Sequence, residues 1–161
     1  MSLVHKVGMA DLKICVPPDV LSTLGLGSCI GICLYDPGSK ISGLAHIMLP
    51  SSELIKNNSN VAKFADTAII KLIDDMVTAG ANKRRLVSKI AGGAQMFAFT
   101  SQNDSMKVGQ RNAESVRLIL KGLNIPILAD DTGGNYGRTI EFYSDNGKLL
   151  IKTIGHGTKE V

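Results

Sequence analysis

Cys29 and His46 are the residues of this sequence whose types and surroundings best fit covalent chemistry. Cys29 follows a short segment that contains Gly25, Gly27 and Ser28, and glycine allows a tight bend and the close approach of another backbone. A cysteine directly after such a bend can lie at a strand edge with its backbone N–H pointing into a cleft, where it could help to hold an oxyanion. Gly27 and Ser28 are therefore candidates to line that cleft.

The residues between Cys29 and His46 predict a β-hairpin that brings the two side chains together. Ser28 to Tyr35 and Ser42 to Leu49 are apolar and partly β-branched, which is typical of strands, and Asp36-Pro37-Gly38-Ser39 between them is turn chemistry. A symmetric turn at the centre of this segment pairs Cys29 directly with His46, with Cβ atoms about 4.5–5.5 Å apart on one face. A four-residue loop keeps that register, whereas an odd-length loop shifts it by one and separates the two side chains onto opposite faces.

A cysteine beside a histidine suits nucleophilic catalysis. A free thiol has a pKa near 8.5, and a neighbouring imidazolium lowers that pKa by stabilising the reactive thiolate. The same histidine can protonate an amine leaving group, and a third group that holds the ring completes a triad. Two other readings of these residues remain open from spacing alone. Cys29 could be a small buried apolar residue, as we expect for Cys33 and Cys15, or Cys29, Cys33 and His46 could be metal ligands, although no second close Cys or His pair completes a structural zinc site.

The composition limits the class of protein. The 161 residues fit a single domain spanning 1–161, and 44% apolar with 20% charged residues is an ordinary globular balance. Aromatic residues make up 4%, there is no Trp, and the only compact basic cluster is Lys83-Arg84-Arg85 in a chain of net charge +4, so we expect no nucleic-acid partner. Three cysteines without a repeating spacing are not a disulfide framework. With no signal-peptide pattern and no membrane-length apolar run, we expect a cytoplasmic protein without membrane insertion.

The periodicity predicts an α+β fold. Apolar residues recur at helical spacing over Val61 to Ala79, with Ser59 or Asn60 as the cap and Gly80 as the end, and a second helix is expected over Arg111 to Lys121 with Gly122 as its stop. Further strands are expected, in addition to the hairpin, over Leu86 to Ala91, Ile125 to Ala129, Thr139 to Tyr143 and Lys148 to Ile154. Several of the strands are joined by turn signals, which favours a mixed or antiparallel sheet assembly with helices packed against it.

Six motifs follow one another along the chain: Leu24 to Cys29, Ala45 to Pro50, Lys63 to Asp66, Lys89 to Phe97, Gly109 to Asn112 and Asp131 to Gly134. Taken together in this order, they resemble the motifs of the chemoreceptor glutamine deamidase family CheD. The resemblance extends from about residue 4 to residue 155, and the family commonly has Tyr in place of Phe64.

The resemblance implies a function and a set of site residues. It implies a Cys-His-Thr triad at Cys29, His46 and Thr23, deamidation of glutamine side chains on methyl-accepting chemotaxis receptors, methylesterase activity in some members, and binding of the CheC phosphatase. It also implies a sheet-based α/β sandwich with flanking helices, resembling the catalytic domain of cytotoxic necrotizing factor, and a reaction that needs no metal or organic cofactor. Two alternatives stay open: a non-catalytic adaptor that binds receptors or CheC, and a different reaction of a cysteine nucleophile, such as transglutamination or peptide cleavage.

Overall fold

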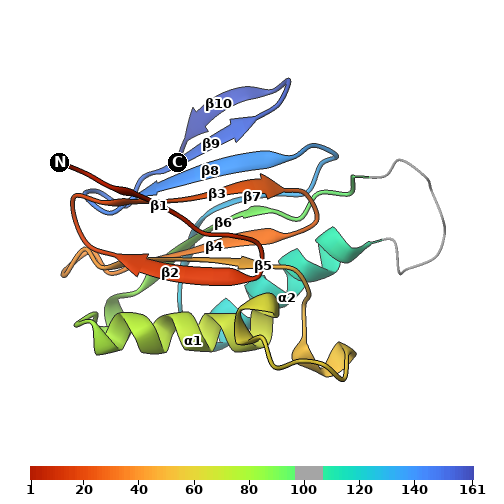
Figure 1. The fold of residues 1–161 in the computed structure, drawn as a ribbon, viewed down its shortest axis with the longest axis horizontal. Coiled ribbons are helices and arrows are strands. Elements are labelled where there is room, and N and C mark those ends of the chain that lie inside the picture. The colour runs from red at the N-terminus through yellow and green to blue at the C-terminus, as the bar shows by residue number, and fades with distance from the viewer. Residues whose placement is uncertain (97–106) are drawn as a thin grey trace.

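The computed structural model describes residues 1–96 and 107–161, in which two five-stranded sheets and two α-helices form three layers (Figure 1). One sheet has the strand order β1-β3-β8-β9-β10 and the other β2-β5-β4-β6-β7. Both α-helices cover the outer face of the second sheet (Figure 1). The predicted α+β class is confirmed, whereas the likeness to cytotoxic necrotizing factor and the single-domain boundary of 1–161 stay predictions.

The first four strands alternate between the two sheets, β5 to β7 then stay in the second sheet, and β8 to β10 belong to the first. The strands are β1 (Val4–Lys6), β2 (Asp11–Cys15), β3 (Val20–Leu26), β4 (Ile30–Tyr35), β5 (Ser42–Ile47), β6 (Val87–Gly92), β7 (Ile127–Thr132), β8 (Arg138–Tyr143), β9 (Leu149–Thr153) and β10 (Gly157–Glu160). The α-helices are α1 (Ala65–Thr78) and α2 (Val108–Gly122), and short 3₁₀ turns lie at Ser52–Leu54, Val61–Lys63 and Lys83–Arg85. The sequence analysis found six of these strands and missed β1, β2, β3 and β10.

Strands β4 and β5 lie at the centre of the molecule. Every residue of both strands is buried, because one face packs against the two helices and the other against the first sheet. This explains why both strands are continuous apolar runs instead of alternating ones. A side chain on the inner face of β4 or β5 therefore lies between the two sheets, where it can reach residues of β3 and β8.

The two predicted helices exist, with different ends. The stretch from Val61 begins as a 3₁₀ turn capped by the Asn60 side chain and becomes α1 only at Ala65, because Phe64 is extended with φ −117° and ψ 140°. Helix α2 begins at Val108, three residues before the predicted start. Gly122 is its last residue and not its stop; the chain leaves the helix at Asn124, which takes the left-handed conformation at φ 58°.

The predicted hairpin between β4 and β5 exists, but its register differs by two residues. Tyr35 pairs with Ser42, Gly31 with His46 and Ile30 with Ile47, so Cys29 is not directly opposite His46. The loop is longer than the predicted turn, and the backbone N–H of Asp36 donates to the Ile41 carbonyl. A shift of two keeps each side chain on its original face of the sheet. Cys29 and His46 are therefore diagonal neighbours, a relation with a typical separation of about 7–8 Å.

Candidate active site

Cys29 and His46 lie on the face of the second sheet that packs against the first. Cys29 belongs to the cluster of buried residues between the sheets, together with Cys33 on β4 and Leu44 on β5. Gly31 lies directly opposite His46. A Cβ atom at Gly31 would come within 2.7 Å of Ile140 Cδ1, so the first sheet packs closely over the backbone at this point. The residue opposite the imidazole therefore contributes no side chain of its own.

Thr23 holds the His46 ring from the opposite sheet. Its Oγ1 lies 2.7 Å from His46 Nδ1 and 2.6 Å from the Val7 carbonyl oxygen. A carbonyl oxygen only accepts, so the Thr23 hydroxyl proton is donated to Val7 and Oγ1 must accept a hydrogen bond from Nδ1–H. This pair of contacts fixes the tautomer of the neutral ring, with the proton on Nδ1 and the lone pair on Nε2.

His46 Nε2 is the free nitrogen of the ring. It is buried and forms no hydrogen bond with any residue that the structure describes, so the Cys29 thiol is not bonded to it. Burial lowers the pKa of His46 and raises the pKa of the Cys29 thiol. The sequence analysis expected an imidazolium that lowers the thiol pKa, and the structure gives the opposite direction. The resting pair is a neutral thiol and a neutral imidazole, which suits His46 to act as a general base.

Three successive carbonyl groups of the turn before β4 are fixed by hydrogen bonds. The Gly27 carbonyl accepts from Ala94 N–H at 2.8 Å, and the Cys29 carbonyl accepts from Gly93 N–H at 2.9 Å. The Ser28 carbonyl accepts from the Asn112 side chain at 2.9 Å. No group in the described ranges accepts a hydrogen bond from the backbone N–H of Ser28 or Cys29. Within those ranges the two donors are unpaired, which is what groups that stabilise an oxyanion require.

Gly92 allows the close approach that this turn needs. Its φ is +115°, and a Cβ atom there would lie 2.2 Å from the Cys29 carbonyl oxygen. Both the conformation and the distance exclude other residues without a backbone shift. The glycine pair of the Lys89 to Phe97 motif therefore shapes the cysteine turn. Phe97, the last residue of that motif, lies outside the described residues.

Asn112 on α2 is a site residue to which the sequence analysis gave no role. It is fully buried, and its Nδ2 donates to the carbonyls of Ser28 and Met48 at 2.9 and 3.0 Å. Its Oδ1 is buried without a hydrogen-bond partner in the described part of the chain. The only signal in the sequence was the Gly109 to Asn112 motif, whose spacing does not show that Asn112 faces the cysteine turn.

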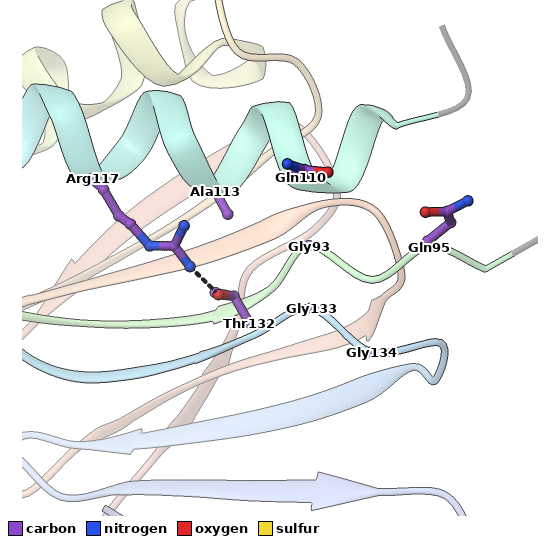
Figure 2. Close-up of a pocket in the computed structure, with 8 residues that line it drawn as sticks. All are labelled: Gly93, Gln95, Gln110, Ala113, Arg117, Thr132, Gly133 and Gly134. Atoms are coloured by element: carbon purple, nitrogen blue, oxygen red, sulfur yellow. Dashed lines mark hydrogen bonds between the residues drawn. The ribbon is translucent and has the colours of Figure 1, made fainter. Parts of the chain in front are cut away.

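A polar cavity of about 290 Å³ lies beside this turn, between α2 and the ends of β6 and β7 (Figure 2). Gly93 is part of its wall, but none of Cys29, His46 and Thr23 lines it. Its charged side chain is already paired, since Arg117 donates to Thr132 at 2.6 Å (Figure 2). Arg117 also donates to Asp130 at 2.7 Å. The cavity is therefore a neighbour of the candidate triad and not its opening.

The candidate triad is nearly closed to solvent. Cys29 is 7% exposed, and His46 and Thr23 are each 1% exposed. Apolar side chains of Leu24 and Met96 nearby are exposed, and Met96 lies close to Gly27, where its Cγ would be 3.1 Å from an added Cβ. The site thus has an apolar surface beside a buried cysteine.

The other cysteines lie in the core. Cys33 is fully buried and burial raises its pKa strongly, while burial raises the pKa of Cys15 to about 11. Within residues 1–96 and 107–161, no group of three or more His, Cys, Asp or Glu side chains is arranged to hold a metal ion. In the same residues, no helix is long and apolar enough to cross a membrane.

Comparisons with known proteins agree with the motifs. Residues 48–153 match a family model described as "CheD chemotactic sensory transduction", a range that begins after the three candidate triad residues. The alignments with curated relatives include these three residues, because they extend over nearly the whole chain. A protein of Lachnoclostridium phytofermentans named "Probable chemoreceptor glutamine deamidase CheD" is 59% identical over 97% of both chains. A protein of Halalkalibacterium halodurans named "Chemoreceptor glutamine deamidase CheD" is 52% identical over the full length of both.

A search of solved structures found the hypothetical protein YfiH of Bacillus licheniformis, with a TM-score of 0.44 and 12% identity over 81% of this chain and 59% of that one. This structural likeness does not identify a family. The family is assigned from the full-length sequence relatives and from the family model. The chain belongs to the CheD family.

Proposed function

We propose that this protein deamidates glutamine side chains of chemotaxis receptors, with Cys29 as the nucleophile. The contact between Thr23 Oγ1 and His46 Nδ1 is the observation that carries the proposal. It leaves a buried imidazole with its lone pair on Nε2, on the same face of the sheet as the Cys29 thiol. The names of the full-length relatives supply the substrate class, a glutamine side chain of a chemoreceptor.

The proposed reaction proceeds through a thioester. His46 Nε2 takes the thiol proton as Cys29 Sγ attacks the glutamine Cδ, and the backbone N–H groups of Ser28 and Cys29 stabilise the oxyanion. His46 then gives the proton to the leaving nitrogen, which departs as ammonia. Water attacks the thioester with His46 as base, so that glutamate and the free thiol are formed. Thr23 holds the ring in one tautomer throughout.

Substrate binding has to open the site. Cys29 is only 7% exposed in the free protein, and Nε2 is not bonded to the thiol. The proposal therefore requires the side chains around the cysteine turn to move when a receptor segment binds, so that the amide carbon and Nε2 both come within reach of the sulfur. A receptor segment with apolar side chains would cover the exposed Leu24 and Met96.

The partner and the compartment follow from the same proposal. The receptor's cytoplasmic helical segment is the proposed substrate, and the CheC phosphatase is the proposed competitor for the same surface. Methylesterase activity on receptor glutamyl esters would use the same thioester, since methanol replaces ammonia as the leaving group. A cytoplasmic location stays a prediction.

A receptor fragment and mass spectrometry test the proposal. The fragment should gain the Gln-to-Glu mass change at specific glutamines with wild-type protein and with Cys33→Ala, which keeps the Cys29 thiol. Cys29→Ala should bind the fragment but leave it unchanged. An unchanged fragment with wild type would refute the enzyme, and chemotaxis that Cys29→Ala fully restores would identify the adaptor alternative. Cut peptides or amine adducts would indicate another cysteine reaction.

A further inference from the structure

Asn112 joins the two strand ends that carry the candidate catalytic pair. The paired region of β4 and β5 ends at Ile30 and Ile47, so Ser28 and Met48 lie just beyond the last backbone pair. Asn112 Nδ2 donates one hydrogen bond to each of their carbonyls, at 2.9 and 3.0 Å. A single side-chain amide thus continues the connection between the two strands where the backbone ladder stops.

The contact with Ser28 acts directly on the Cys29 backbone. The Ser28 carbonyl and the Cys29 N–H belong to one planar peptide unit, in which the two groups point in opposite directions. A donor that holds the carbonyl towards α2 therefore turns the N–H away from α2. Donation to the carbonyl also polarises the peptide unit, and hydrogen bonds in such a chain strengthen one another.

Only a side chain with two donors can make both contacts. Two carbonyl oxygens accept and cannot donate, so the partner must supply both protons, as the NH₂ group of asparagine does. Leucine has a similar size but would leave both carbonyls without this donor. Asn112 Oδ1 has no partner among the described residues although it is buried, so the residue is oriented by its two donors alone.

We propose that Asn112 is a positioning residue that fixes the Cys29 N–H as an oxyanion donor. It acts through the Ser28–Cys29 peptide unit and touches neither the substrate nor the reacting atoms. This inference rests on the proposed function, because an oxyanion forms only if Cys29 attacks a carbonyl group. It predicts a loss in kcat and not in KM, since the oxyanion exists only in the transition state and the tetrahedral intermediate.

Two reactions of the same sulfur separate this role from a structural one. Deamidation passes through an oxyanion, whereas alkylation by iodoacetamide displaces iodide from a saturated carbon and needs no oxyanion donor. In Asn112→Leu we expect kcat for deamidation to fall roughly 10- to 100-fold, somewhat less than for complete removal of an oxyanion donor. The alkylation rate at Cys29 should stay within about twofold, because the sulfur and its access are unchanged.

Ser115→Ala is the matched control on the same helix. Ser115 Oγ donates to the Pro50 carbonyl at 2.8 Å, so this change also removes a contact between α2 and the chain after β5, but it leaves the Ser28 peptide untouched. Its deamidation rate should equal that of wild type. Asn112→Ser, which keeps a hydroxyl donor too short to bridge both carbonyls, serves as a second variant, and all rates are normalised to the folded fraction from thermal unfolding.

The outcomes are distinct. Loss of deamidation with retained alkylation supports the proposal. Three results would overturn it: both reactions are lost equally, neither is lost, or both Asn112 variants unfold while Ser115→Ala stays folded. Asn112 would then be structural or dispensable. A wild-type protein that releases no ammonia from the receptor fragment refutes the proposed function itself, whereas an active wild type with an equally active Asn112→Leu refutes this inference alone.

Discussion

Replacing Thr23 by valine tests whether one hydrogen bond sets the chemistry of His46. Valine has the shape of threonine but lacks the hydroxyl group. Thr23→Val removes the acceptor for His46 Nδ1–H at 2.7 Å and the donor to the Val7 carbonyl at 2.6 Å. The neutral ring is then free to carry its proton on Nε2, where it cannot accept the Cys29 proton.

The size of the effect follows from the burial of these groups. Thr23 and His46 are each 1% exposed, so water does not replace the lost partner. A buried group left without its hydrogen bond costs about 1–3 kcal/mol, and a bond to a charged group contributes about 1.5–3 kcal/mol. Because His46 gains a proton in the proposed reaction, the second range is the one that applies to the activation barrier. At 1.36 kcal/mol for each factor of ten, kcat should fall roughly 10- to 100-fold.

Thr23→Ser is the control, because serine keeps the hydroxyl and loses only a methyl group. Ammonia release from a receptor fragment gives kcat and KM for both variants, and thermal unfolding reports their stability. We expect Thr23→Ser to retain most of the activity and Thr23→Val to lose it through kcat. A Thr23→Val protein with wild-type kcat, or a Thr23→Ser protein that loses as much as Thr23→Val at equal stability, would refute this role of Thr23.

Three further predictions concern the thiol, the cysteine turn and the hairpin loop. Because burial raises the pKa of Cys29, its alkylation by iodoacetamide in the free protein should rise with pH to a midpoint above that of an ordinary thiol; a plateau already reached below pH ~7 would contradict a neutral resting pair. Gly92→Ala should lower both thermal stability and deamidation, because its Cβ would meet the Cys29 carbonyl oxygen at 2.2 Å, whereas Gly122→Ala in open space at the end of α2 should stabilise by about 0.5–1 kcal/mol; equal behaviour of the two alanine variants would contradict this. Asp36→Ala should destabilise by about 2–4 kcal/mol at neutral pH, because the buried Asp36 carboxylate accepts hydrogen bonds from the N–H groups of Gly38 and Asn82, and a hydrogen bond to a charged group contributes about 1.5–3 kcal/mol; chemical unfolding measures this, and a change below about 0.5 kcal/mol would refute it.

The Asp36 contribution also has a defined pH dependence. The Arg85 guanidinium pairs with the Asp36 carboxylate, which also accepts hydrogen bonds from backbone N–H groups. Together these contacts hold the pKa of Asp36 well below its usual range. A carboxylate whose pKa is lowered on folding stabilises the protein at pH values above its unfolded pKa of about 3.9, and this stabilisation is lost as the pH falls towards the lowered pKa. The difference in unfolding free energy between wild type and Asp36→Ala should therefore shrink below pH ~4.

The same carboxylate explains why the sequence predicted the hairpin but not its register. Apolar strands around a turn segment were enough to identify β4 and β5. The register depends on the loop, and Asp36 in that loop accepts hydrogen bonds from Asn82 N–H and from the Arg85 side chain, 46 and 49 residues away in the sequence. No local pattern shows these contacts. Because the register differs by two residues and not by one, Cys29 and His46 still lie on the same face of the sheet, as predicted, although they are not directly opposite each other.

Thr23 and Asn112 mark the limit of prediction from spacing. Thr23 was named only through the family resemblance, and its strand β3 was missed because Gly25 interrupts the pattern, with φ 68° at an irregularity in the pairing with β8. Its contact with His46 joins two sheets, so it depends on how the layers pack. Asn112 likewise reaches the site from α2 across a gap of 84 residues to Ser28. Both residues act through tertiary contacts that leave no periodic signal.

The distribution of unpaired polar groups gives the strongest reason to connect these residues with chemistry. Buried polar atoms in folded proteins nearly always have partners, because an unpaired one costs free energy. In the part of the chain that the structure describes, the two buried side-chain atoms without a partner are His46 Nε2 and Asn112 Oδ1, and both belong to this site. Close by, the carbonyls of Gly27, Ser28 and Cys29 are bonded, while the N–H groups of Ser28 and Cys29 have no acceptor within residues 1–96 and 107–161. Among the described residues, the unpaired groups beside the thiol are thus a ring nitrogen with a lone pair and two backbone donors, and the proposed attack of a thiol on an amide needs a base and oxyanion donors of these kinds.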